Sequence, residues 1–377
     1  MSTSTPMMRA LAASIRAGVP ALVWGNPGIG KTSVVTSLAS AWNWHVETVI
    51  GSIREATDFL GFGVEVDGGE GRIGHVAYAP PGWARAAAQA DRALVFFDEL
   101  TTAPPSVRKA MLRVLQERYA GDFALPDTVA LVAAANPPES AVDGYDLEPP
   151  MANRLIHLDF DFAQTAWLDG LTGGFDTVAQ PSMNELIGPG DDQHRAQVRG
   201  AVTAFLRTRP DLIEPGVPSD PVQAGRAWPS RRSWTNAIAA VSEIRPDDTD
   251  AACLLLAGAV GEGPAREYLT FRRELDLPTP EQVIADADKI NWAAMRPDRA
   301  FAVAGALRAY ALGNRADKTT WLGAINALSA MAENGLPDIA QGAVAALLTN
   351  HPGDVPVPRR VVDAFTDLFV GMGRWAA

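Results

Sequence analysis

The first 160 residues alternate between short apolar runs and segments whose apolar positions recur with helical spacing. Short runs without polar alternation are typical of strands that are buried on both faces of a parallel sheet. We expect such strands over residues 19–24, 44–50, 93–97, 128–134 and 155–160. Helices are expected between them over residues 32–42, 82–90 and 104–118. This alternation predicts an α/β domain with a central parallel sheet.

Two stretches interrupt the alternation. Residues 64–78 carry Asp-Gly-Gly-Glu-Gly between alternating segments, and residues 119–126 carry Gly-Asp after an aromatic residue. Turn residues between alternating segments are typical of β-hairpins, so we expect a small hairpin in each place. The alternative interpretation, a plain connecting loop, is equally compatible with the pattern.

The strand pattern ends near residue 160, and helical patterns continue to the C-terminus. Residues 170–193 are rich in Gly, Pro, Asp and Gln, which is typical of a loop or hinge. We therefore predict three parts: an αβα core over residues 1–162, a small all-helical lid over 163–243, and a further helical region over 244–377. Nothing in the sequence assigns a role to the third part.

Composition and charge narrow the class of protein. With 377 residues, 47% hydrophobic and 20% charged, the chain has the composition of a globular protein. Its single cysteine, Cys253, lies in an apolar run, so we expect a buried small side chain and no disulfide. The five histidines are scattered without metal-ligand spacing, and we interpret them as structural.

Neither a membrane span nor a secretion signal is expected. The longest apolar run, residues 251–260, is about half as long as a bilayer requires. The N-terminus lacks a basic region followed by an apolar stretch, which predicts a cytoplasmic protein. The net charge of −12 is shared equally, because residues 1–162 carry 12 basic and 18 acidic residues and the remainder carries 20 and 26. This balance argues against nucleic acid as a partner.

A phosphate-binding loop follows the first predicted strand and opens the first predicted helix. The pattern G-x-x-x-x-G-K-[ST] is matched by Gly25, Asn26, Pro27, Gly28, Ile29, Gly30, Lys31 and Thr32, with Ser33 next in the helix. Glycines allow backbone N–H groups to turn around a phosphate, and the helix N-terminus adds positive potential. We expect Lys31 to reach the β- and γ-phosphates of ATP, and the hydroxyl of Thr32 to ligate Mg²⁺.

Four further residues complete a candidate hydrolytic site. Asp98 and Glu99 end an apolar strand, where Asp98 would hold Mg²⁺ and Glu99 would polarise the attacking water. Two consecutive acids favour hydrolysis over small-molecule kinase chemistry. Asn136 stands at the tip of another strand, where it could orient that water, although alone it would be a turn residue. Arg154 precedes the last strand and alone would be a surface charge.

The chain resembles the AAA+ ATPases, and within them the MoxR-like and dynein-related group. Besides the motifs above, the resemblance is carried by residues 54–61, 110–118, 121–122, 136–139 and 152–155. It implies that Arg154 is a finger that enters the nucleotide site of a neighbouring subunit. It also implies a sensor-2 arginine in the lid, either Arg231 or Arg232, of which Arg232 is favoured by the Ser-Trp that follows. Leu155 departs from the phenylalanine that members often carry.

The resemblance implies a Mg²⁺-dependent ATPase that converts ATP and water to ADP and phosphate within a ring of identical subunits, most commonly a hexamer. Such proteins typically remodel a protein client, often with a partner that carries a von Willebrand A domain. Asp58 and the hairpin at 64–78 are candidate client contacts. Two other functions stay open: a nucleic-acid-linked motor or defence NTPase, and a nucleotide-dependent switch or scaffold with little turnover. The presence of a base such as Glu99 argues against the scaffold.

Overall fold

The computed structural model describes residues 5–67, 75–137, 140, 147–160, 164–174, 180–314 and 317–366. Contacts divide the chain into two compact units. Unit 1 comprises Met1–Pro189 with Pro215–Ala265, and unit 2 comprises Gly190–Glu214 with Arg266–Ala377. Segment 215–265 therefore belongs to the same compact unit as the sheet. The boundary predicted at 162 lies outside the described residues, and the three-part division stays a prediction.

Unit 1 is built on a five-stranded sheet with the order β2-β5-β8-β1-β9, in which every pair is parallel. The strands are β1 (Ala21–Trp24), β2 (His45–Ile50), β5 (Ala93–Asp98), β8 (Val129–Ala135) and β9 (Ile156–Asp159). All five occur where the apolar runs predict them, and the α/β fold class is confirmed. The register pairs Ile50 with Asp98 and Trp24 with Ala135, so the carboxyl ends of these strands lie along one edge.

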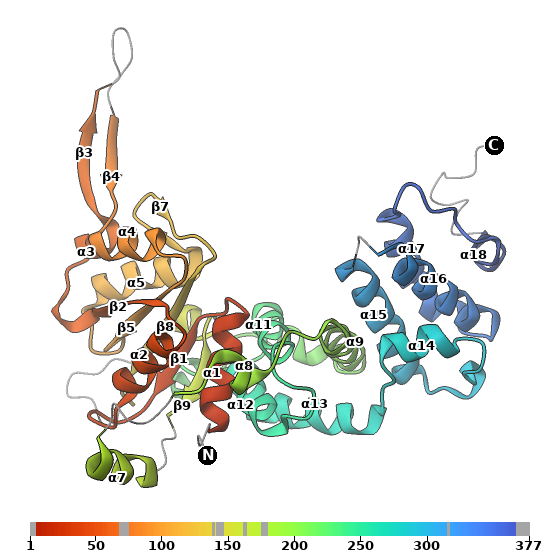
Figure 1. The fold of residues 1–377 in the computed structure, drawn as a ribbon, viewed down its shortest axis with the longest axis horizontal. Helices are drawn as coiled ribbons and strands as arrows, with labels where there is room; N and C mark the ends of the chain where they lie inside the picture. Colours follow the sequence, from red (N-terminus) through yellow and green to blue (C-terminus); the bar gives the residue numbers. More distant parts are fainter. Residues whose placement is uncertain are drawn as a thin grey trace. The chain divides into compact units, whose positions relative to one another are not determined.

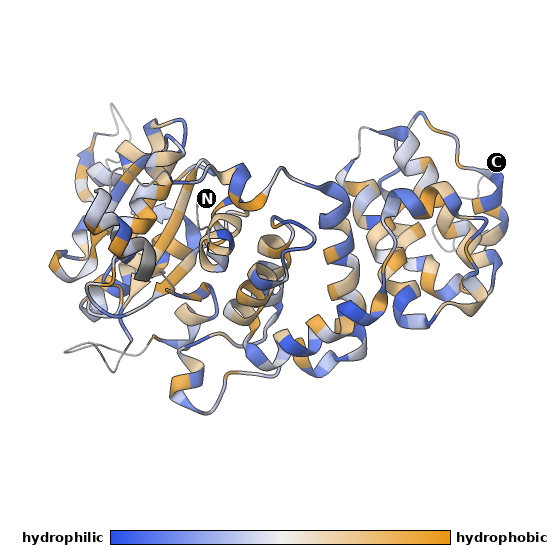
Figure 2. Cartoon of the chain, turned by 60° about the horizontal axis from the view of Figure 1, so that its bottom comes forward, coloured by the Kyte–Doolittle hydropathy of each residue, from blue (hydrophilic) through white to orange (hydrophobic). Residues whose placement is uncertain are grey.

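Helices cover the sheet and bury its apolar strands, whose hydrophobic residues are visible in Figure 2. Those of unit 1 are α1 (Pro6–Arg16), α2 (Lys31–Ala41), η1 (Gly51–Ile53), α3 (Thr57–Leu60), α4 (Gly82–Gln89), α5 (Pro105–Glu117), α6 (Pro149–Ala152), α7 (Gln164–Gly173), α8 (Met183–Ile187), α10 (Pro221–Ala224), α11 (Arg231–Val241) and α12 (Thr249–Val260). Helix α12 packs on the edge strand β9 at Gly258, where an added Cβ would lie 2.2 Å from the carbonyl oxygen of His157. Cys253 of α12 is exposed, so its predicted burial is wrong: it faces away from the side of the helix that packs.

Two antiparallel hairpins accompany the parallel sheet, as the turn patterns predict, and the larger one extends away from the core (Figure 1). The larger pairs β3 (Phe62–Val66) with β4 (His75–Ala79), and the smaller pairs β6 (Tyr119–Ala120) with β7 (Phe123–Ala124). Residues 68–74, which connect β3 to β4, lie outside the described residues. The hairpin interpretation of both stretches is confirmed for the residues that are described.

Every regular element in the described part of unit 2 is a helix. Its elements are α9 (Asp192–Thr208), η4 (Pro210–Leu212), α13 (Glu262–Leu275, from Arg266 onward), α14 (Pro280–Asp286), η5 (Trp292–Ala294), α15 (Pro297–Gly313), α16 (Lys318–Glu333), α17 (Pro337–Thr349) and α18 (Arg359–Ala364). Helices α9 and α15 approach closely because glycines meet at their crossing, with Gly200 against Ala302 and Gly305. No helix in the described part of the chain is long and apolar enough to span a membrane.

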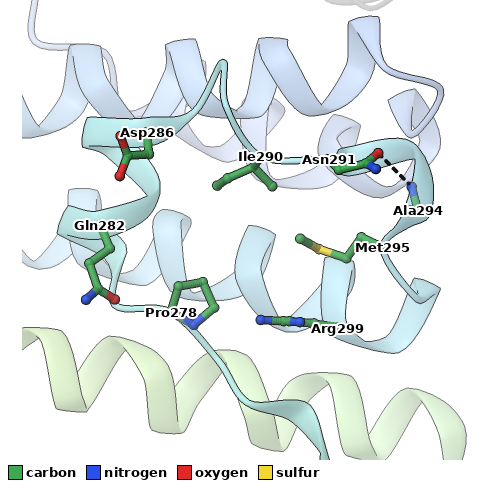
Figure 3. A pocket seen from close by; sticks show the side chains of 8 residues that line it. All are labelled: Pro278, Gln282, Asp286, Ile290, Asn291, Ala294, Met295 and Arg299. Atoms are coloured by element: carbon green, nitrogen blue, oxygen red, sulfur yellow. Dashed lines mark hydrogen bonds between the residues drawn. The ribbon is translucent and has the colours of Figure 1, made fainter.

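A shallow cavity of about 400 Å³ opens on unit 2 between α14 and the start of α15 (Figure 3). Its polar side chains have structural partners: Asp286 bonds Lys289, Asn291 caps η5, and Arg299 donates to the carbonyl of Asp276. Apolar Ile290 and Met295 face the opening between them. The polar groups named here, which line the cavity, are therefore already engaged in hydrogen bonds with nearby residues of unit 2.

Candidate active site

The phosphate-binding loop connects β1 to α2 in a left-handed backbone conformation. Gly28 and Gly30 have φ angles of 80° and 94°, which residues with a Cβ rarely adopt. Gly30 stands at the N-cap of α2, and no described side chain caps this helix start. The first N–H groups of α2 are therefore available to an anion, and the helix dipole favours one there.

Lys31 is held over the loop by three oxygens. Its Nζ donates to the carbonyls of Gly25 and Asn26 at 2.6 and 3.0 Å, and to Oδ1 of Asn136 at 2.9 Å. The side chain is only 7% exposed, and burial lowers its pKa against the opposing influence of the Asp98 and Glu99 carboxylates. The sequence thus brings a buried ammonium to the place where phosphates would bind.

Two oxygen groups that could ligate a metal ion lie at the start of α2 and the end of β5. Thr32 Oγ1 donates to Asp98 Oδ2 at 2.5 Å, which joins the two residues predicted to hold Mg²⁺. A hydroxyl and a carboxylate are ligands that Mg²⁺ prefers, together with water and phosphate oxygens. The residues present therefore fit the metal that the motif predicts.

Glu99 adopts an unusual backbone conformation directly after the strand. Its φ angle is 58°, and its N–H donates to Asp98 Oδ1 at 2.9 Å. The carboxylate accepts a hydrogen bond from the hydroxyl of Ser52 in η1, which follows β2. Sequence reasoning missed Ser52, because the pairing of β2 beside β5, which brings this segment to Glu99, is evident only in the structure.

Asn136 follows β8 and contacts two parts of the site. Its Oδ1 accepts from Lys31, and its carbonyl accepts from Thr101 Oγ1 at 3.2 Å. The amide therefore lies at the same sheet edge as Asp98 and Glu99, as its place at a strand tip predicts. Lys31, Thr32, Asp98 and Asn136 are brought together by direct hydrogen bonds.

The predicted arginines form a second group in unit 1. Arg154 follows α6 and is partly buried, whereas Arg231 and Arg232 are exposed in the first turn of α11. Burial lowers the pKa of the Arg154 guanidinium, the positive charge of Arg232 lowers it further, and Glu117 opposes both. Arg154 and Arg232 therefore lie close enough for their charges to repel.

A third arginine, Arg226, was not singled out from the sequence. Its guanidinium carbon lies 4.1 Å from the centroid of the Trp24 ring, and its Nη1 lies 3.4 Å from Asp159 Oδ1. Trp24 is the last residue of β1, directly before the phosphate-binding loop. The Trp24 indole also donates to Nδ1 of His157, so a packed polar cluster supports the base of the loop.

Comparison with known proteins agrees with this geometry. Residues 20–155 match the model of the AAA domain, dynein-related subfamily. These residues form an AAA+ ATPase domain of that subfamily. The match covers β1, the loop, β5 and β8, and it ends directly after Arg154.

The rest of the chain is less informative in comparison. No curated protein matches the sequence. Among solved structures, a candidate ATPase from Cytophaga hutchinsonii aligns over 72% of this chain and 89% of its own, with 18% identity and a TM-score of 0.43. The assignment of the AAA+ domain therefore rests on residues 20–155.

Proposed function

We propose that this chain is a Mg²⁺-dependent ATPase that works as a ring of identical subunits in the cytoplasm and remodels a protein client. The observation that carries the hydrolytic part is the hydrogen-bonded set of Lys31, Thr32, Asp98 and Asn136 at one sheet edge, with Glu99 beside it. A protein that only bound nucleotide would not require a general base at this place.

Each side chain has a defined task in hydrolysis. Lys31 and the N–H groups of the loop and the α2 start would bind the β- and γ-phosphates of ATP. Thr32 and Asp98 would hold Mg²⁺, partly through water, and the metal would neutralise charge on the phosphates. Glu99 would accept a proton from water as the new P–O bond forms and the bond to the β-phosphate oxygen breaks. Asn136 would orient that water, which leaves ADP and phosphate.

The arginine pair supports completion of the site by a neighbouring subunit. In the proposed ring, Arg154 would enter the nucleotide site of the next subunit, and Arg232 would be the sensor-2 arginine. Head-to-tail contacts of this kind close into rings. Six subunits and a partner with a von Willebrand A domain are what the resemblance to MoxR-like proteins implies.

The β3–β4 hairpin supports a protein client. Alternate residues of a strand share a face, so Phe62, Val64 and Val66 lie on one side of the hairpin. These side chains are exposed, Phe62 to 68%, on an element that extends away from the sheet (Figure 1). A face with three exposed apolar side chains suits a partly unfolded polypeptide, and Asp58 lies in α3 just before it.

Two substitutions test the hydrolytic assignment. Lys31→Ala should weaken ATP binding, because it removes the positive charge on the phosphates. Glu99→Gln should keep ATP affinity but lower turnover by roughly 100-fold or more, because the amide cannot accept the proton. A fluorescent ATP analogue and a coupled phosphate assay measure the two effects, with exposed Lys289→Ala and Glu274→Gln as controls. If Glu99→Gln turned over ATP as fast as the wild type, Glu99 would not be the catalytic base. If the wild type itself showed no turnover, a nucleotide-dependent switch or scaffold would be favoured.

A mixing experiment tests the ring. Arg154→Ala should bind ATP yet lose roughly 10³-fold in turnover, because its neighbour lacks a finger. Glu99→Gln lacks its own base but offers an intact finger. If subunits exchange randomly, an equal mixture places about a quarter of the interfaces in the competent arrangement, so ATPase activity should reappear. Mixed rings seen by native mass spectrometry without recovered activity would contradict action across the interface.

A further inference from the structure

Asn153 is buried at the end of α6, directly before Arg154, and both polar atoms of its amide are engaged by a distant segment. Only 5% of its surface is exposed. Its Nδ2 donates to the carbonyl of Trp228 at 2.9 Å, and its Oδ1 accepts from Ser230 Oγ at 2.6 Å. Both partners immediately precede α11. Because both hydrogen bonds of this buried amide go to one segment, they fix that segment against the backbone at Asn153.

The segment returns a hydrogen bond one turn into α11. Asn236 Nδ2 donates to the carbonyl of Arg154 at 3.2 Å. Ser230 also forms a capping box with Ser233, so the residue that Asn153 contacts is the one that starts α11. The Asn153 side chain and the Arg154 carbonyl are thus tied to the start of α11 by three hydrogen bonds. We name Asn153 and Asn236 the asparagine clasp.

The clasp holds together groups that repel one another. Burial is the main cause of the lowered pKa of the Arg154 guanidinium, the positive charge of Arg232 lowers it further, and Glu117 opposes both. Arg232 also occupies the first turn of α11, where the helix dipole disfavours a cation. The two like charges therefore repel one another, and an anion bound nearby would relieve that repulsion. The hydrogen bonds of the clasp hold the two arginines near each other despite this repulsion. Such an arrangement is useful where both positive charges act on one bound anion.

We propose that Asn153 is a positioning residue for the arginine finger: through the clasp, it fixes Arg154 relative to the N-terminus of α11. This inference rests on the proposed role of Arg154 and extends it to residues outside the finger itself. Asn153 acts through Arg154 and does not contact the nucleotide. The amide is required because a carboxylate in its place would face the Trp228 carbonyl without a donor.

The first test separates binding from turnover. Asn153→Ala should bind a fluorescent ATP analogue within about two-fold of wild type, because the phosphate loop is intact. Its kcat should fall by roughly 10-fold to 100-fold, the range expected when a reacting group is displaced by about 1 Å. Asn153→Asp should not rescue it, and Asn236→Ala should show a smaller loss of kcat. Asn350→Ala is the matched control, since it removes an asparagine bond to a helix carbonyl in unit 2.

A double-mutant cycle shows whether Asn153 acts through the finger. If it does, adding Asn153→Ala to Arg154→Ala should cause no further loss of kcat, because the finger is already absent. A purely structural role would lower kcat in both backgrounds. If Asn153→Ala fails to fold, Asn236→Ala carries the same cycle, because it removes a single hydrogen bond.

Two outcomes would overturn the inference while leaving the proposed ATPase intact. One is an active wild type in which Arg154→Ala is inactive but Asn153→Ala and Asn236→Ala keep full kcat. The other is an additive cycle. By contrast, a folded wild type with no ATPase activity would overturn the proposed function itself, so the two failures are distinguishable.

Discussion

At the scale of single residues, His157 combines burial with a hydrogen bond from Trp24 that requires the neutral form of its ring. Nδ1 accepts from the Trp24 indole at 2.9 Å, so the ring proton must lie on Nε2, which bonds the carbonyl of Ala152 at 2.9 Å. Burial lowers the pKa of His157 to about 4, although the bond to Ala152 opposes the shift. Protonation would therefore disturb the support of the phosphate-binding loop.

This shift predicts a pH dependence of stability. The unfolded chain binds a proton at His157 near pH 6.5, and the folded protein does so only near pH 4. Between these values the unfolded state holds more protons, so the contribution is complete above about pH 6.5 and is lost as the pH falls. At pH 5 the loss amounts to about 2 kcal/mol. We expect urea unfolding at pH 7 and pH 5 to show that the wild type loses about 2 kcal/mol more unfolding free energy between these pH values than His157→Gln does.

The glutamine side chain of the His157→Gln variant can donate to the carbonyl of Ala152 and accept from the Trp24 indole, but it does not titrate in this range. Equal losses of stability in the two proteins would show that other groups account for the acid sensitivity.

Local motifs at strand ends predict which side chains lie together, while the roles assigned to them stay predictions. Lys31, Thr32, Asp98 and Asn136 follow strand ends, and parallel strands bring such ends to one edge. Asn153 was passed over because its partners are 75 and 77 residues away in the sequence. Cys253 was placed in the core because its neighbours are apolar, but a helix exposes one side of even an apolar run.

At the scale of elements, the approach of α12 to β9 depends on one glycine. Alanine normally stabilises a helix by about 1 kcal/mol relative to glycine. At Gly258, however, the new Cβ would lie 2.2 Å from the His157 carbonyl oxygen, a backbone atom that cannot move aside alone. We expect Gly258→Ala to destabilise unit 1 by roughly 1–3 kcal/mol, as overpacking does.

Gly263→Ala is the matched control, because a Cβ there meets no atom within 4 Å. Thermal unfolding followed by circular dichroism measures both variants. A Gly258→Ala protein as stable as the control would show that α12 packs on β9 less closely than the structure places it.

Hydrophobic spacing predicted the five strands of the sheet and helices α2, α4 and α5, with ends that differ by one or two residues, but it did not predict α1. It could not predict which helices cover which strands. Residues 251–260 form an apolar run in the sequence, but the strand that they contact, β9, lies about a hundred residues earlier in the chain. The run itself does not indicate that partner. The same limit applies to segment 215–265, which joins unit 1 through α11 and α12.

At the scale of the whole molecule, the net charge favours a protein over a nucleic acid as the client. Nucleic acid binding depends mainly on basic side chains that displace counterions from phosphates. The chain carries 32 basic and 44 acidic residues, a net charge of −12, and its acidic excess is shared between residues 1–162 and the remainder. The face of the β3–β4 hairpin that carries Phe62, Val64 and Val66 exposes these three apolar side chains, which suit a polypeptide better than a phosphate backbone.

We therefore predict no saturable binding of single-stranded or duplex DNA at about 10 μM protein and physiological salt, a concentration within the range of ordinary nonspecific binders. Fluorescence anisotropy at two salt concentrations measures it, with the Glu99→Gln protein and ATP present so that the assembled form is tested. ATP turnover should likewise be unchanged by added DNA. Binding that weakens steeply with salt, together with DNA-stimulated turnover, would reverse the choice and favour a nucleic-acid-linked motor, because a local basic surface would then outweigh the net charge of the molecule.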